Sequence, residues 1–157
     1  MPDESVHVML ERQIYLVPTL AAIAQVLLHP DQVPPASLAK AQRVAERHKQ
    51  SVNAYYQAGG RIAMGADTGT LCNPHGNNAL ELQHMVSAGM KPIDALISAT
   101  SNASDLLRLS DRGSLRAGHV ADMLMVSGNP LEDIQCAAQK ENHLFVFKDG
   151  VRVTGVN

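Results

Sequence analysis

The sequence has no tryptophan, and aromatic residues of all kinds make up only 3% of its 157 residues. A hydrophobic core must therefore be filled mainly by alanine, leucine, valine and methionine. An excess of positive charge is also missing, because the formal net charge is −2. Without a basic face, nucleic acid is excluded as the main partner.

Cysteines and long apolar runs are scarce as well. Cys72 and Cys136 are too far apart for a CxxC pair, and two thiols make no disulfide framework. Ordinary reduced thiols and a cytoplasmic location are the expectation. No signal-peptide pattern follows Met1, and no apolar run approaches the roughly 20 residues of a membrane span. We therefore expect no membrane partner.

The strongest helical pattern lies in residues 37–58. Apolar and small side chains recur there at alternating spacings of three and four residues, which predicts one long helix with a single packed stripe. Ser37 is expected to cap its first turn, and Gly59-Gly60 are expected to end it. The stripe consists of Leu38, Ala41, Ala45, His48, Val52 and Tyr55.

Two short apolar runs, residues 14–17 and 61–65, flank this helix. Both are expected to be buried strands, since a strand covered on both faces need not alternate. A short helix is expected at residues 3–11, residues 20–28 are apolar but ambiguous, and three prolines in residues 29–35 predict a loop. The alternation of helices and strands predicts parallel strands and an α/β fold.

Three further helices are expected after the second strand. Asn78 followed by Glu81 is typical of a capping box, in which the glutamate bonds the backbone at the start of its own helix. Gly89 is expected to end that helix. Pro92 suits the first turn of the next one, and Ser101 is expected to cap the third.

The sequence is expected to form two parts, residues 1–110 and residues 111–157. The second part begins with turn-forming residues and contains three short β-prone runs. Asp149-Gly150 separates the last two runs and is a strong signal for a two-residue hairpin turn. The three runs are residues 121–126, 143–148 and 151–153.

One stretch carries residue types that point to a chemical site. The strand at residues 61–65 delivers Asp67 to its carboxyl end, where ligands gather in α/β folds. Gly65 and Gly69 flank this aspartate and allow close backbone approach or unusual dihedral angles. Asp67 is therefore a candidate metal ligand or base. From the residues alone, an aspartate that caps the following loop is the alternative.

Short motifs along almost the whole chain form a recognisable set. Residues 64–69 read Met-Gly-Ala-Asp-Thr-Gly, and residues 75–82 read His-Gly-Asn-Asn-Ala-Leu-Glu-Leu. In order and spacing, the set resembles the amidohydrolase superfamily, and within it the imidazolonepropionase-like and Xaa-Pro dipeptidase-like branch. The other matching pieces are residues 17–20, 88–92, 95–96, 99–100, 113–115, 121–122, 129–134 and 148–150.

The resemblance implies a (β/α)8 barrel of the TIM type, with a small β-sandwich built from both chain ends. Residues 3–20 match the helix after strand 6 and then strand 7, and residues 61–65 match strand 8. A complete barrel of this type needs about 250 residues. We therefore expect the chain to be the C-terminal part of such a barrel together with part of the sandwich.

The resemblance also implies site roles. Family members bind one or two divalent ions, usually zinc. Asp67 matches their last metal ligand, which takes a proton from metal-bound water and passes it to the leaving nitrogen. His75 matches a substrate-contacting position, with a loop histidine that holds backbone as the alternative, and Thr19 is expected to line the site. The family's His-x-His ligand pair is absent from this sequence.

These points predict part of a metal-dependent hydrolase of a C–N bond, with a small amide or dipeptide as substrate. The isolated chain is expected to be inactive. A cyclic-amide hydrolase of the imidazolonepropionase type is the alternative within the class, and a truncated, non-catalytic remnant or interaction module is the alternative outside it. An incomplete barrel exposes strand edges that favour a homo-oligomer. An in-frame His-x-His about 200 codons upstream would support the enzyme, and a stop codon would support the remnant.

Overall fold

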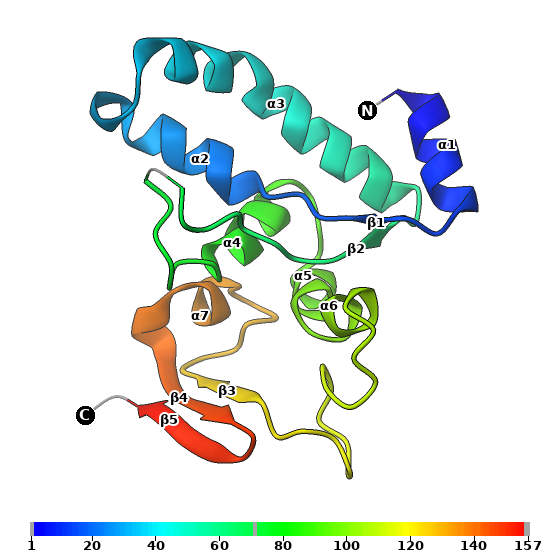
Figure 1. Cartoon of the computed structure of the whole chain (residues 1–157), viewed down its shortest axis with the longest axis vertical. Coiled ribbons are helices and arrows are strands. Elements are labelled where there is room, and N and C mark those ends of the chain that lie inside the picture. The colour runs from blue at the N-terminus through cyan, green and yellow to red at the C-terminus, as the bar shows by residue number, and fades with distance from the viewer. Residues whose placement is uncertain (1, 71, 156–157) are drawn as a thin grey trace.

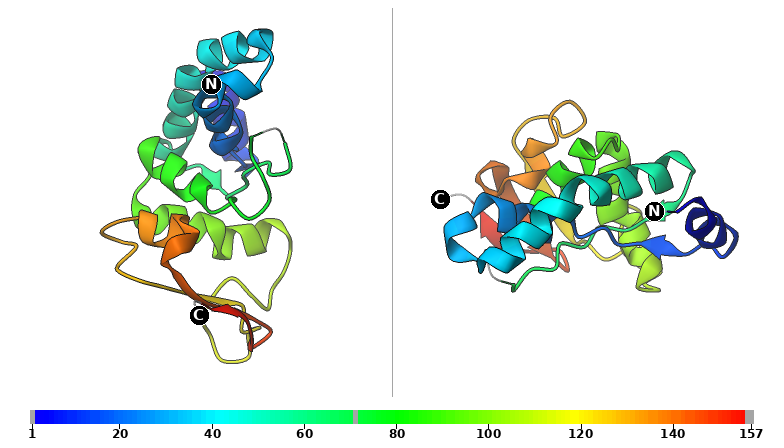
Figure 2. Two further views of the ribbon diagram at one scale, coloured as in Figure 1. Left: turned by 90° about the vertical axis from the view of Figure 1, so that its left-hand side faces the viewer. Right: turned by 90° about the horizontal axis from the view of Figure 1, so that it is seen from above.

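The structure, a computed structural model, describes residues 2–70 and 72–155. The helices are α1 (Asp3–Glu11), α2 (Leu20–Leu28), α3 (Pro35–Gln57), α4 (Leu80–Ser87), α5 (Pro92–Ala99), α6 (Ser101–Leu106) and α7 (Gln135–Ala138), with 3-10 turns at Pro30–Gln32 and Lys140–Asn142. The strands are β1 (Tyr15–Leu16), β2 (Arg61–Ile62), β3 (Met123–Val126), β4 (His143–Lys148) and β5 (Val151–Gly155). These elements lie in tiers along the molecule (Figures 1 and 2): α2 and α3 at one end, then the β1–β2 pair, then α4 to α7, and the β3–β5 sheet at the other end.

The central feature is the parallel pairing of β1 with β2, which confirms the predicted α/β arrangement. Tyr15 pairs with Arg61 and Leu16 pairs with Ile62, with α3 between the two strands in the chain. The strands are shorter than expected, and the prediction that both are buried is wrong at their margins. Ile14 and Val17 beside β1 are each 40% exposed, because no third strand of the described residues joins this sheet.

Helix α3 follows the predicted periodicity. Its inward face buries Ala41, Val52 and Tyr55, and the Tyr55 hydroxyl donates a hydrogen bond to the Ile14 carbonyl at 2.6 Å. The expected Ser37 cap is wrong, since the helix already begins at Pro35 and has no side-chain cap. Proline has its backbone angle preset for a first helical turn, which moves the start upstream of the serine.

The other helices correct several details. Residues 20–28, ambiguous in sequence, form α2. Pro92 starts α5 as predicted, but Ser101 lies inside α6 rather than before it, and neither helix has a side-chain cap. The capping box of α4 is also wrong, because that helix has no side-chain cap. The Glu81 side chain bonds the backbone of α2 instead.

A single hydrophobic core joins the two parts of the sequence. Alanine and branched aliphatic residues dominate it and methionine contributes, as the scarcity of aromatics predicted, and Met85 and Tyr55 are fully buried. The short helix α7, which the sequence did not reveal, adds Ala137 and Ala138 to this core. None of the helices in the described ranges is long and apolar enough to cross a membrane. The buried core residues are Leu20, Val52, Tyr55, Ile62, Leu82, Met85, Ala88, Met90, Ala95, Ile134, Ala137 and Ala138.

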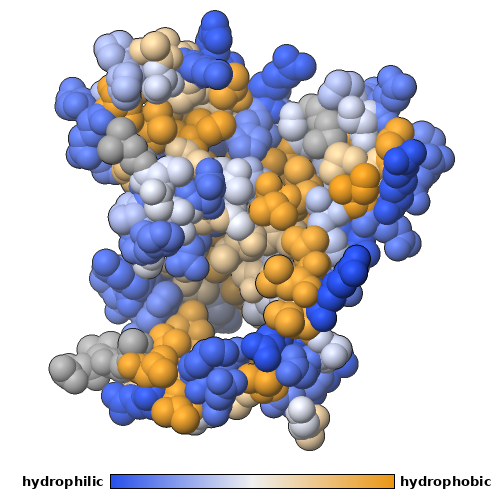
Figure 3. Space-filling view, in the orientation of Figure 1, coloured by the Kyte–Doolittle hydropathy of each residue, from blue (hydrophilic) through white to orange (hydrophobic). Residues whose placement is uncertain are grey.

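The three predicted strands of the second part form an antiparallel sheet in the order β3-β4-β5. Lys148 pairs with Val151 across the two-residue turn of Asp149 and Gly150, both at positive φ, which confirms the hairpin. The sheet is poorly covered: Met125 is 51% exposed and Val151 is 65% exposed. Figure 3 shows apolar side chains at the surface along this end of the molecule and over its middle.

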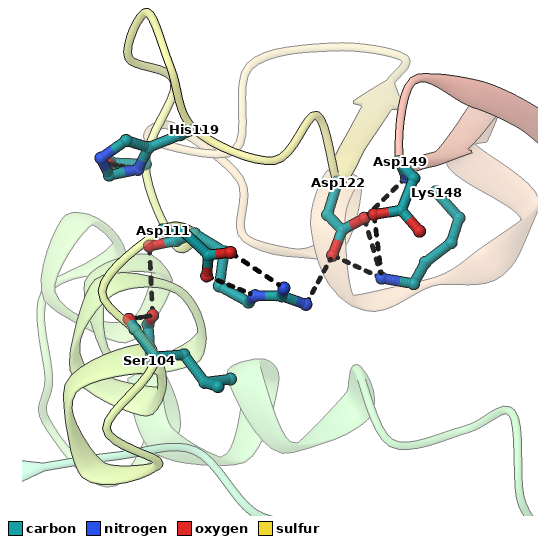
Figure 4. Close-up of polar contacts among 9 residues, drawn as sticks. Ser104, Asp111, His119, Asp122, Lys148 and Asp149 are labelled. Atoms are coloured by element: carbon teal, nitrogen blue, oxygen red, sulfur yellow. Dashed lines mark hydrogen bonds and ion pairs between the residues drawn. The ribbon is translucent and has the colours of Figure 1, made fainter.

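An exposed ionic cluster holds this hairpin to the loop that precedes β3 (Figure 4). The Asp122 carboxylate accepts hydrogen bonds from the Lys148 ammonium at 2.8 Å and from the Asp149 backbone N–H at 2.9 Å. Arg112 lies 3.7 Å from the same carboxylate. The hydrogen bond from Lys148, followed by the one from Asp149, holds the pKa of Asp122 below its usual range. Asp122 therefore fixes the turn of the hairpin against the segment between α6 and β3.

We predict that Tyr55→Phe destabilises the chain by about 1–2 kcal/mol, because the Ile14 carbonyl loses its hydroxyl donor inside the packed region. The free energy of unfolding from urea titration measures this loss. Ser87→Ala is the control, since it removes an exposed hydroxyl that also donates to a backbone carbonyl, and it should cost less than about 0.5 kcal/mol. Equal losses for the two variants would show that Tyr55 does not tie α3 to the β1 segment.

Candidate functional site

Parallel pairing places the carboxyl ends of β1 and β2 at the same edge of the sheet. Thr19 follows β1, and Asp67 follows β2. The two segments touch just beyond the strands: a Cβ on Gly65 would lie 2.5 Å from the Val17 side chain, so only glycine allows this approach. The structure therefore brings two of the three predicted site residues to one edge.

The opposite edge of the sheet carries a separate polar cluster. Arg61 donates a hydrogen bond to the Tyr15 hydroxyl at 2.7 Å and forms an ion pair with Asp105. The Tyr15 hydroxyl donates to Asp105 at 2.8 Å, and its pKa is raised first by burial and then by that hydrogen bond. In barrel folds this amino-terminal edge serves stability, whereas ligands gather at the other one.

Asp67 is an exposed residue in a left-handed backbone conformation, with φ of 50°. Its carbonyl oxygen accepts hydrogen bonds from the Thr70 hydroxyl at 3.2 Å and from the Asn73 amide at 3.1 Å. Within residues 2–70 and 72–155, its carboxylate forms no hydrogen bond or ion pair. The backbone is thus held by the loop, while the carboxylate is left available for a ligand.

Asn73 organises this loop, and the sequence reasoning missed it. It is 1% exposed, and its amide donates to the Ala66 carbonyl at 2.6 Å as well as to that of Asp67. In return, its own carbonyl accepts the Gly69 N–H at 2.8 Å. The signal present in the sequence was the Asn73-Pro74 dipeptide, a pattern that favours turn initiation.

His75 lies in the same loop and is exposed. Its ring packs on Gly69, where a Cβ would meet the Nε2 atom at 2.9 Å, and its Nδ1 is 3.3 Å from the Thr68 hydroxyl. Gly69 also has a φ of 96°, which L side chains rarely adopt. The histidine is therefore anchored beside the neighbours of Asp67, and its role in substrate contact stays a prediction.

Thr19 has an unusual backbone conformation, with φ of 49° and ψ of 42°. A β-branched residue in the left-handed region costs about 1–3 kcal/mol and persists only where its surroundings fix it. The next two residues explain how it is fixed. The Glu81 carboxylate accepts the Leu20 N–H at 2.9 Å and the Ala21 N–H at 2.6 Å.

A pocket of about 440 Å³ opens beside Asp67. One wall belongs to α2, the opposite wall belongs to the start of α3, and Asp67 and Thr70 close one side. Thr19 and His75 do not line it, although α2 begins directly after Thr19. The lining residues of the two helices and the link between them are Ala22, Ile23, Val26, Val33, Pro34, Ser37, Lys40, Ala41 and Val44.

The described residues do not by themselves fit a catalytic metal ion. A catalytic zinc site takes three protein ligands. In residues 2–70 and 72–155, no three histidine, cysteine, aspartate or glutamate side chains come together in a way that could hold a metal. Asp67 is the one predicted ligand in the sequence, so any metal site would need donors in addition to this chain's Asp67.

Sequence comparison shows similarity to known hydrolases. The model of the "Amidohydrolase family" matches residues 1–153. Ochratoxinase from Aspergillus niger is 38% identical over 119 residues, which cover 73% of this chain and 24% of that protein. The chain therefore spans about a quarter of the length of this relative.

Comparison with solved structures gives the same picture. A Xaa-Pro dipeptidase with bound methionine is 35% identical, with a TM-score of 0.86 over 99% of this chain and 38% of the other. A prolidase complexed with N-methylphosphonate-L-proline is 27% identical, with a TM-score of 0.89 over 99% of this chain and 38% of the other. The chain thus shares the fold of one part of these hydrolases.

We predict that Asn73→Asp loosens the Asp67 loop, because two carbonyl oxygens would face a carboxylate instead of an amide donor. Amide hydrogen exchange at Gly69 should become at least about tenfold faster, in line with the loss of buried hydrogen bonds. Asn78→Asp, the same change at an exposed position, is the control and should leave that rate within about twofold. An unchanged rate in Asn73→Asp would mean that the loop is held by other contacts.

Proposed function

The chain belongs to the amidohydrolase family, and from this premise we propose that it forms the C-terminal part of a metal-dependent hydrolase that cleaves the C–N bond of a small amide or dipeptide. Its fold is that of the C-terminal part of a (β/α)8 barrel, with β1 and β2 as strands 7 and 8, followed by part of a small β-sandwich. The observation that carries the proposal is the Asp67 carboxylate, which lies at the carboxyl end of β2 and lines a pocket.

Asp67 has the chemistry that amide hydrolysis needs from a base. In the proposed reaction, it accepts a proton from the attacking water while the water oxygen bonds to the carbonyl carbon. It then gives the proton to the nitrogen as the C–N bond breaks. A divalent metal, usually zinc in this family, would polarise the carbonyl group and lower the pKa of water when bound. Asp67 would be one of its ligands, and other parts of the complete barrel would supply the rest.

The substrate class is supported by the relatives and by the pocket. The similar proteins include a Xaa-Pro dipeptidase, a prolidase and ochratoxinase. The pocket beside Asp67 has mainly apolar walls from α2 and α3, which suit an apolar group next to the scissile amide. We assign substrate contact to His75, which is anchored on Gly69 in the Asp67 loop. Thr19 does not line the pocket of this chain, and we assign it a place in the wall of the larger site that the complete barrel would form.

Three further assignments belong to this proposal. The division into residues 1–110 and 111–157 separates the barrel part from the sandwich part. A cytoplasmic location fits the two free thiols, Cys72 and Cys136. Pairing between copies fits the β1–β2 sheet, because no further strand of the described residues pairs with either of its outer edges.

We predict that the isolated chain, with zinc added, hydrolyses no dipeptide and no N-acyl amino acid. One carboxylate cannot hold an ion that needs three protein ligands. The measurement is release of free amine from a panel of such substrates, with and without a chelator. Zinc-dependent turnover that disappears on chelation would refute the expectation and would require a different metal site.

We also predict the effect of Asp67→Asn in a catalytically active longer protein that contains this chain. The turnover rate should fall by about 10²–10⁴, because the amide keeps the shape but cannot act as a base. KM should change little, since the substrate keeps its contacts in the pocket.

Asp31→Asn is the matched control, because it makes the same change at an exposed position in a 3-10 turn, and it should retain the parent rate. An Asp67→Asn variant that retained more than about a tenth of the parent rate would rule out Asp67 as the base.

A further inference from the structure

Glu81 is the only buried carboxyl group in the described part of the chain, with an exposed fraction of 0%. A buried charge is costly unless other groups compensate for it. No lysine, arginine or histidine in residues 2–70 and 72–155 forms an ion pair with it. Its two oxygens instead accept the backbone N–H groups of Leu20 and Ala21. The carboxylate therefore completes the first turn of α2 from a helix 60 residues further along the chain.

Of these two bonds, the one from Ala21, at the second helical position, is of the kind that a local N-cap side chain would have accepted. Thr19 stands at the N-cap position of α2, but its side chain makes no capping bond, and its left-handed backbone is unusual for that position. The positive end of the helix dipole favours a negative group at this place. Glu81 therefore fixes the chain direction at the point where the β1 segment becomes α2.

The same turn leads directly into the wall of the Asp67 pocket. Leu20 and Ala21 are buried, and the next residues Ala22, Ile23 and Val26 line the pocket opposite α3. A shift of the first turn would move this wall relative to Asp67, which is held separately by Asn73. We propose that Glu81 is a positioning residue, whose carboxylate holds the first turn of α2 and thereby sets the α2 wall of the Asp67 pocket.

This proposal rests on the proposed function only in taking that pocket as the substrate site.

The proposal also implies that the cap of α2 depends on pH. Burial raises the pKa of Glu81 from 4.5 to about 7, against the opposing effect of the two backbone hydrogen bonds. Protonation turns one acceptor oxygen into a hydroxyl donor, so one of the two capping bonds is lost. The cap is therefore complete above about pH 7 and weakened below it.

Few other titratable groups belong to the elements around Glu81. Helix α2 has none, and α4 itself adds only His84, whose pKa is lowered by burial and then by Lys49 of α3. Helix α5 adds Asp94, and α7 adds Cys136, with Asp133 just before it. The causes of the Glu81 shift are burial and the bonds to Ala21 and Leu20. A His84→Gln variant therefore separates the titration of Glu81 from that of His84.

The test uses the isotope-labelled 157-residue chain and nuclear magnetic resonance from about pH 5.5 to about pH 8.5, so no substrate or activity is needed. The amide protons of Leu20 and Ala21 should shift together with a midpoint near the Glu81 pKa of about 7. Their exchange protection, corrected for the intrinsic pH effect, should rise about tenfold across the midpoint. The methyl signals of Ile23 and Val26 should follow the same midpoint, while that of Val44 on the α3 wall should not.

Two variants show whether Glu81 or His84 causes the titration. Glu81→Gln should abolish the midpoint at all four α2 residues, and His84→Gln should preserve it. Amides of Leu20 and Ala21 that do not titrate in the unsubstituted chain would overturn the proposal without any variant having to fold. A midpoint that survives Glu81→Gln would overturn it as well. A response confined to Leu20 and Ala21 would reduce Glu81 to a helix cap and would also overturn it. Loss of activity in Asp67→Asn is a separate result, so the two proposals can fail independently.

Discussion

The position of the candidate site depends on the parallel register of two short strands. Tyr15 pairs with Arg61, and Leu16 pairs with Ile62. Because the two strands point the same way, the segments after them reach one edge of the sheet, and the polar cluster of Tyr15, Arg61 and Asp105 occupies the other. A strand pair this short has little stability of its own. The long helix α3 stabilises the pair further, since it packs its apolar face inward and bonds the β1 segment through the Tyr55 hydroxyl.

The parts of this arrangement that the sequence predicted are those specified by repetition or by local geometry. Periodicity located α3, Asp149-Gly150 located the hairpin, and the predicted strand before Asp67 located this residue beyond the carboxyl end of β2. One of the errors shows how a local pattern competes with tertiary contacts. Glu81 has the spacing of a capping box, but its side chain bonds Leu20 and Ala21 instead. No pattern within one helix can reveal a partner 60 residues away.

Only part of the candidate site could be predicted from the sequence. An aspartate flanked by glycines suggests chemistry, but its loop is fixed by Asn73, which looks like an ordinary turn residue until its burial is known. His75 was placed beside Asp67 by a resemblance, whereas its packing on Gly69 comes from the fold. Residue types can thus be read from sequence. The contacts that hold these residues depend on the folded conformation of the loop, which could not be predicted from the sequence.

The burial of Glu81 shows that this part of the fold is not arranged for maximal stability. A carboxyl group whose pKa rises from 4.5 to about 7 on folding binds its proton more tightly in the folded chain. Its contribution to stability is therefore greatest at or below about pH 4.5 and declines as the pH rises to 7, with a total loss of roughly 3 kcal/mol. The two hydrogen bonds to α2 recover only part of the cost of burying the charge. A neutral side chain would avoid that cost but could not complete the turn after Thr19 with two acceptors. The carboxylate is best understood as a constraint on the geometry of α2, at a place where the adjoining backbone is itself strained.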